Sequence, residues 1–172
     1  PQRDNPVLDE VEKIRDILTA TGMDEIITYS MTNPLDESRL ELKGSFSSVD
    51  YVPVENPLSH DRSHLRRKLL PGALISVRNN LRYNNQVRVF EAGNVFLPQE
   101  GQLLPDEPLQ LCLVMTGKRQ LQSWHSSGNA NIDFFDMKGV LENLFASLHL
   151  RKVMWNKARD LPYHPGSCTE LC

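Results

Sequence analysis

A strand pattern, VRVFEAGNVF, occupies residues 87–96, with predicted helices and further strands on both sides of it. Valine and phenylalanine dominate the stretch, and these residue types favour a β-strand. Gly93 interrupts the apolar run, which within a strand often indicates a bulge. Glu91 stands out because a carboxylate on an apolar strand needs a partner when it is buried. It could bind a ligand, but a structural ion pair is favoured, with Arg82 or Arg88 as the basic partner nearest in the sequence.

Working outward from this strand, apolar periodicity and capping residues give the other elements. Strands are predicted over residues 26–31, 49–54, 109–115 and 152–158. Helices are predicted over residues 6–20, 34–40, 63–70, 71–83 and from Asp133 to 148. Helices and strands mix along the chain, and the strands are joined by turns. This order favours one α+β domain, an antiparallel sheet with helices packed on it.

Composition limits the class of protein. The chain has 172 residues, 40% of them hydrophobic, which is enough for one core. The net charge of -3 disfavours wholesale binding of nucleic acid. No apolar run approaches the roughly 20 residues of a membrane helix. The polar N-terminal residues argue against a signal peptide. The three cysteines lack the spacing of a disulfide framework, which fits a reducing cytosol. We expect a cytoplasmic protein without a membrane partner, of which residues 1–172 are a fragment, truncated at its C-terminal end.

A basic run lies in NPLSHDRSHLRRKLLPG, residues 56–72, where Arg62, Arg66, Arg67 and Lys68 are close together. Such a run can neutralise phosphates, so one hypothesis is an autonomous RNA-binding module that uses residues 62–68. The stretch lacks aromatic residues on which bases would stack. A helix whose charges mostly face water is therefore favoured.

Other candidate sites are weak. His164, Cys168 and Cys172 are possible zinc ligands, but a fourth ligand and the usual paired spacing are missing. Residues 59–61, Ser-His-Asp, have the residue types of a hydrolytic triad, yet triad members converge from separate segments. Asp133 and Asp136 are explained by capping of the last helix. The sequence contains no nucleotide fingerprint, glycine-rich phosphate loop or metalloprotease pattern. We therefore assign no catalytic, cofactor-binding or metal-binding residue.

Several motifs together resemble the β subunit of bacterial-type phenylalanyl-tRNA synthetases, in its module that is similar to a class II synthetase catalytic domain. Each motif alone is weak, and their order and spacing carry the resemblance. They are GMDEIITYSMTNP (22–34), NPLS (56–59), LRRKLLPGAL (65–74), Asn79, Arg82, VRVFEAGNVF (87–96), FFDMKG (134–139) and HPG (164–166).

The resemblance implies a class II catalytic-like fold in a non-catalytic copy. In that family the α subunit carries the chemistry, which uses ATP and Mg²⁺ to attach phenylalanine to its tRNA. Class II domains place an arginine and an acid after the strand that corresponds to residues 87–96. Leu97, Pro98 and Gln99 stand there in this chain, and an uncharged side chain cannot neutralise a phosphate.

The resemblance also implies partners: the α subunit, a second β subunit in an α2β2 assembly, and tRNA through the whole enzyme. The first helix and strand resemble the class II motif that builds the interface between subunits. The apolar face of that helix is broad, and an apolar face left open usually marks a partner site. The candidate interface residues are Val7, Val11, Ile14, Ile17 and Leu18.

Overall fold

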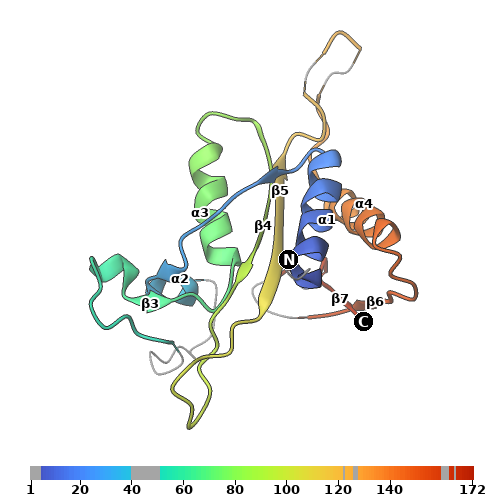
Figure 1. Ribbon diagram of the computed structural model, residues 1–172. Coiled ribbons are helices and arrows are strands. Elements are labelled where there is room, and N and C mark those ends of the chain that lie inside the picture. The colour runs from blue at the N-terminus through green and yellow to red at the C-terminus, as the bar shows by residue number, and fades with distance from the viewer. Residues whose placement is uncertain (1–4, 40–50, 122, 126–127, 160–162, 165) are drawn as a thin grey trace.

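The computed structural model describes residues 5–39, 51–121, 123–125, 128–159, 163–164 and 166–172. A sheet stands at the centre, with α3 on one face and with α1 and α4 on the other (Figure 1). The helices are α1 Pro6–Ala20, α2 Pro34–Ser38, α3 Leu70–Asn80 and α4 Phe134–Ser147, with a short 3-10 turn, η2, at His60–Arg62. The strands are β1 Asp24–Glu25, β2 Met31–Thr32, β3 His64–Leu65, β4 Gln86–Asn94, β5 Leu109–Gly117, β6 Trp155–Lys157 and β7 Thr169–Leu171.

The central sheet has the strand order β1-β4-β5. β4 and β5 are antiparallel and pair without interruption from Gln86↔Gly117 to Asn94↔Leu109. β1 joins the other edge of β4 in the parallel direction, so the sheet is mixed at that edge. Two small antiparallel ladders, β2-β3 and β6-β7, lie outside the central sheet. The α+β fold class expected from the sequence is confirmed.

Alternation along β4 divides the core into two halves. Phe90 points to the α1 and α4 side, where it packs with Leu18 and Leu144. Val87 and Val89 point to the opposite side and pack with Val77 of α3. Glu91 has the same parity as the two valines and therefore lies on the α3 side of the sheet.

Helix ends follow their local chemistry. The Asn5 side chain accepts a hydrogen bond from the Val7 amide at the start of α1, where Pro6 occupies the first turn. Asp133 and Asp136 form a reciprocal capping box at the start of α4. The predictions of a helix from Pro6 to Ala20 and of a helix capped by Asp133 are confirmed.

Other sequence predictions were wrong in part. Residues 63–70 are not a helix, because β3 pairs with β2 there and α3 begins only at Leu70. Residues 26–31 are not one strand, since β1 ends at Glu25 and β2 begins at Met31. The strand predicted over residues 49–54 lies in part outside the described residues, and only an isolated bridge from Pro53 to His64 is present in the rest. Within the described residues, no helix is both long and apolar enough to cross a membrane.

Candidate functional site

A buried ion pair between Arg66 and Glu91 is the main polar feature of the α3 side of the sheet. Only 6% of Arg66 and 2% of Glu91 are exposed. The Arg66 guanidinium donates from Nη1 to Glu91 Oε1 over 2.6 Å, and Nε donates to the Asn94 carbonyl over 3.0 Å. Charge-assisted hydrogen bonds of this length are strong, and each ion compensates the other for its lost hydration.

Thr28 completes the cluster from the chain segment that follows β1. Its amide donates to Glu91 Oε1 over 3.2 Å and its hydroxyl donates to Glu91 Oε2 over 2.7 Å. Arg66 Nη1 lies 2.9 Å from the Thr28 hydroxyl. Because β1 stops pairing with β4 at Glu25, these side-chain bonds hold the segment beside β4 after the strand ladder has ended.

Two glycines provide the space that the cluster needs. A Cβ atom at Gly93 would lie 2.5 Å from Arg66 Nη2, and one at Gly72 would lie 2.8 Å from Thr28 Oγ1. The bulge predicted at Gly93 is wrong, since the pairing of β4 with β5 is continuous through Gly93 and Gln110. Glycine at position 93 allows the close approach of the Arg66 guanidinium and does not mark a change in strand register.

The basic partner predicted for Glu91 was also wrong. Arg88 lies on the other face of the sheet and donates to the Arg119 carbonyl over 2.7 Å, and Arg82 is exposed at the end of α3. The true partner, Arg66, is 25 positions away in the sequence. Nothing in the local pattern marks it, because the pairing depends on how β3 and the start of α3 pass over β4.

The fold therefore places the basic side chains of residues 62–68 in different environments. Arg66 is buried, which contradicts the expectation that it faces water. The Arg62 guanidinium lies 3.6 Å from the centre of the Tyr29 ring, and that of Arg67 lies 5.4 Å from the Tyr51 ring. Sequence reasoning missed these aromatic partners because they come from other segments of the chain.

No metal-binding cluster occurs among the described residues, which include His164, Cys168 and Cys172. Cys168 instead lines a cavity of about 750 Å³ between α4 and the β6-β7 ladder. Lys138 and Trp155 line it as well, with the ammonium 5.1 Å from the ring centre. Neither Arg66 nor Glu91 borders this cavity.

The candidate interface residues of α1 occupy different depths. Leu18 is fully buried and Val11 is 6% exposed, so both are core residues of this domain. Ile14 and Ile17 are half-buried and pack against the core cluster. Val7 is 59% exposed, as is its neighbour Leu8, which the sequence analysis did not single out as a site residue. The open apolar surface of α1 is thus confined to its first turn.

Structural comparison first defines the class. The chain aligns with a pyrrolysyl tRNA synthetase of Desulfitobacterium hafniense with a TM-score of 0.65 and 15% identity, covering 90% of this chain and 49% of that one. A second structure, of pyrrolysyl-tRNA synthetase from the same organism, aligns with a TM-score of 0.62 and 18% identity, covering 86% of this chain and 49% of that one. The chain therefore shares the fold of these synthetases, in agreement with the class II synthetase-like fold that the family resemblance implied.

Sequence comparison then gives the family. The family described as "Phenylalanyl tRNA synthetase beta chain CLM domain" matches residues 1–172, and the chain belongs to it. The chain is 36% identical over 165 residues to the phenylalanine–tRNA ligase β subunit of Syntrophotalea carbinolica, covering 94% of this chain and 20% of that protein. It is 38% identical over 161 residues to that of Carboxydothermus hydrogenoformans, covering 92% of this chain and 20% of that protein. The chain thus spans about a fifth of these relatives.

We expect the Arg66–Glu91 pair to be essential for the fold. Replacing Glu91 with alanine leaves a buried guanidinium without its counter-charge, which should lower the free energy of unfolding by about 3–5 kcal/mol. Urea unfolding of the purified chain measures this. An unfolding free energy equal to that of the wild type would show that the pair contributes nothing.

Two glycine substitutions provide the matched control for this prediction. Gly93→Ala should also destabilise, by about 1–3 kcal/mol, because its methyl group displaces Arg66. Gly139→Ala in α4 meets no atom within 4 Å, and it should stabilise the chain by about 0.5–1 kcal/mol. Effects of equal sign at the two glycines would contradict the proposed role of Gly93.

A second prediction concerns Cys112, which lies opposite Glu91 on β5. Burial, with a smaller effect of the Glu91 charge, raises the pKa of Cys112 to about 11. The thiolate is the reactive form, so at pH 8 iodoacetamide should modify the exposed Cys172 and leave Cys112 intact. Reactivity of Cys112 should appear only as the pH approaches about 11. Peptide mapping by mass spectrometry reads both sites, and equal labelling at pH 8 would refute the prediction.

Proposed function

We propose that this chain is a non-catalytic scaffold module in the β subunit of a phenylalanine–tRNA ligase. The supporting observation is that the buried charged side chains are paired with each other. Among the described residues, Arg66 and Glu91 are the only buried charged side chains, and they neutralise each other. Neither is left to bind the phosphates of a nucleotide.

The residues after β4 support the same proposal. Leu97 exchanges two backbone hydrogen bonds of 2.9 Å with Asp106, which extends the β4-β5 hairpin. Pro98 and Gln99 follow and are uncharged. The positions at which the class places phosphate-binding charges are thus part of a closed hairpin that carries no cation.

The activity belongs, in this proposal, to the whole enzyme. The complete ligase attaches phenylalanine to its tRNA with ATP and Mg²⁺ in the cytoplasm, and the α subunit performs the chemistry. The β chain pairs with α and with a second β subunit in a heterotetramer, and tRNA binds to the assembled enzyme. The names of the relatives, phenylalanine–tRNA ligase β subunit, support this role.

The proposed subunit interface is the first turn of α1 together with the edge segment after β1. Val7 and Leu8 are each 59% exposed, Ile27 is 89% exposed and Tyr29 is 65% exposed. Ile27 and Tyr29 alternate with Thr28, which is fixed by Glu91, so both side chains project away from the cluster. Large exposed apolar side chains on ordered elements are typical of partner surfaces.

The outer edge of β5 presents backbone groups with which another strand could pair. The Ile26 amide donates to the Phe90 carbonyl, so the backbone of Phe90 is directed toward β1. Leu113, its partner in β5, therefore directs its N–H and C=O away from β4. No strand pairs with that outer edge in the described part of the chain. We propose that residues 1–172 form one domain within a longer β chain, as the share of the relatives that they cover suggests.

The geometry does not favour the alternative function, RNA binding through Arg62–Lys68. Arg66 is buried against Glu91, and the Arg62 side chain lies on the Tyr29 ring. Arg62 and Arg66 therefore do not form a continuous row of phosphate contacts with the other basic residues of the run.

The absence of adenylation chemistry is directly testable. The purified chain should show no phenylalanine-dependent exchange of pyrophosphate into ATP, because no cation lies at positions 97–99. The complete enzyme serves as the positive control. Exchange above background with the purified chain would overturn the non-catalytic proposal.

The interface proposal is tested with Leu8→Glu in the full-length β chain. A carboxylate placed within an apolar contact is desolvated without a partner, so assembly with α should weaken at least about tenfold, roughly 1.4 kcal/mol. Co-purification and analytical ultracentrifugation measure assembly, and thermal melting measures folding.

Thr19→Glu is the matched control, since it adds the same charge at an exposed position of the same helix. Ile17→Glu is a poorer test, because Ile17 packs against the core and its loss would destabilise the domain. Assembly of the Leu8 variant at wild-type affinity would exclude the first turn of α1 from the interface.

A further inference from the structure

Residues 62–90, the stretch that contains α3, carry an unbalanced charge. They include seven arginine or lysine residues and no aspartate or glutamate, although the whole chain has a net charge of -3. Any anion that pairs with these cations must therefore come from elsewhere in the chain or from a partner. A local excess of one charge bears on association with other molecules rather than on the fold.

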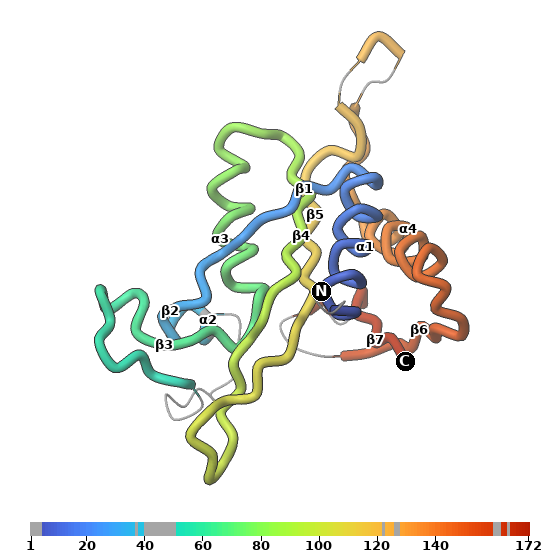
Figure 2. Tube along the Cα trace, viewed as in Figure 1, coloured from blue at the N-terminus to red at the C-terminus, as the bar shows by residue number. Residues whose placement is uncertain are grey.

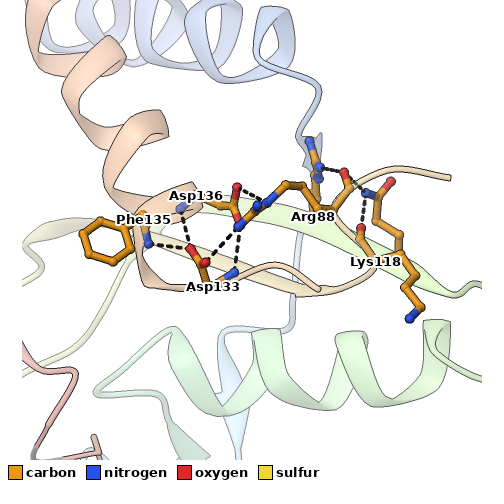
Figure 3. Close-up of polar contacts among 7 residues, drawn as sticks. Arg88, Lys118, Asp133, Phe135 and Asp136 are labelled. Carbon is orange, nitrogen blue, oxygen red and sulfur yellow. Dashed lines mark hydrogen bonds and ion pairs between the residues drawn. The ribbon is translucent and has the colours of Figure 1, made fainter. Parts of the chain in front are cut away.

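Most of these cations have partners within the chain. Figure 3 shows Arg88 on the α4 side of the sheet, where it donates to the Arg119 carbonyl over 2.7 Å. Arg66 is paired with Glu91 on the α3 side. Five of the seven take part in an ion pair, a hydrogen bond or another contact: Arg62, Arg66, Arg67, Lys68 and Arg88.

Arg78 and Arg82 are the two cations that remain. Both are exposed, Arg78 in the last turn of α3 and Arg82 in the turn that follows. Among the described residues, neither guanidinium takes part in an ion pair or a side-chain hydrogen bond. Asp36 borders the same hollow as Arg78 but is paired with Arg39 over 3.1 Å. Asp24 of β1 is exposed and forms no ion pair with any described residue.

The spacing of the two arginines and the residue that follows them point to a partner. Like charges four positions apart on a helix repel each other. The helix dipole favours cations near the C-terminal end of α3, but it does not account for Tyr83, which is 86% exposed. Arginine and tyrosine are enriched at protein interfaces. An anionic partner would remove the repulsion and cover the ring.

These side chains lie on an ordered part of the fold, the end of α3 that leads into β4. Figure 2 shows this end away from α2 and β3. The Leu81 amide donates to the Val77 carbonyl over 2.9 Å, and the Tyr83 amide donates to the Asn80 carbonyl over 3.0 Å. Val77 is buried against β4. A surface that is ordered before binding loses little entropy when a partner docks.

Size and charge indicate the kind of partner. A stable complex between separate proteins buries about 1,200–2,000 Å², of which two arginines and one tyrosine supply only a part. Contacts between domains of one chain are more polar, and the tether raises their effective concentration. The chain covers about a fifth of its β-subunit relatives, so those proteins contain further chain that could supply such a contact. A nucleic acid is disfavoured, because phosphate binding usually involves more than two cations.

We propose that Arg78, Arg82 and Tyr83, the α3 end surface, dock a carboxylate-bearing segment from another domain of the same β chain. The guanidiniums pair with the carboxylates, and the Tyr83 ring packs on the aliphatic part of the segment. The docking requires that this module belong to a longer β chain, as proposed above. The α3 end surface lies on the other face of the sheet from α1 (Figure 1).

The test is photo-crosslinking in the full-length β chain assembled with α. Tyr83→p-benzoylphenylalanine keeps an aromatic ring and links to the chain that covers it. We expect a link within one β chain, seen as an unchanged mass on a denaturing gel, to a peptide that contains aspartate or glutamate by mass spectrometry. Adding Arg78→Glu and Arg82→Glu should lower the yield about tenfold, because like charges then face each other across the contact. The yield should also fall as salt is added, since exposed charges are screened.

Arg151→Glu is the matched control, because it makes the same change of charge at an exposed position after α4. It should leave the yield unchanged. Arg82→Lys keeps the charge and should retain most of the yield. Thermal melting checks that each variant is folded, which we expect because the substituted side chains are exposed.

Three results would overturn the proposal. The first is the absence of any crosslink from position 83. The second is a crosslink to a different partner, whether α, the second β chain, tRNA or residues 1–172 themselves. The third is an equal yield with and without the two charge reversals. Pyrophosphate exchange is measured separately, so failure of the non-catalytic proposal and failure of this one are distinguishable.

Discussion

Glu91 stands within β4, one of the two longest strands described, with 2% of its surface exposed. A carboxylate at that depth requires a cation within hydrogen-bonding distance. Arg66 meets this requirement, and the consequences spread through three segments. Arg66 fixes the chain before α3, its Nη2 requires glycine at position 93, and the two charges together hold Thr28 beside β4. An apolar core alone would not specify these positions so closely, since apolar contacts lack the direction of a charged hydrogen bond.

The same pair connects the fold to the proposed function. Charged side chains on a sheet can bind or act on a substrate only when they are not already paired with each other. In this chain Arg66 and Glu91 neutralise each other, and both bond to Thr28 in the edge segment. The neighbouring Ile27 and Tyr29 are exposed. We infer that the module retains the class II fold for its shape and surfaces. In the proposed interface, the bonds from Thr28 to Glu91 would hold the backbone between Ile27 and Tyr29 in place.

Local sequence patterns predicted local structure well. Asn5-Pro6 with a periodic apolar stripe placed α1, Asp133 placed the start of α4, and alternation placed β5. Patterns failed where tertiary contacts determine the outcome. Residues 63–70 have helical spacing of leucines, yet pairing of β3 with β2 overrides it. Arg66 was expected in water because its burial depends on Glu91, 25 residues away. Leu18 was assigned to an interface because periodicity identifies an apolar face without showing whether the same domain covers it.

The family resemblance came from ordered motifs, and the structure explains why several of those motifs lie where they do. LRRKLLPGAL contains both Arg66 and Gly72, while VRVFEAGNVF contains both Glu91 and Gly93. Each motif thus supplies one charge of the pair and one glycine that makes room for the cluster. Replacing Arg66 or Glu91 leaves the other buried charge unpaired, and a side chain at Gly72 or Gly93 overlaps the cluster. The two motifs therefore act as one structural unit, although nearly thirty residues separate the first charge from the last glycine.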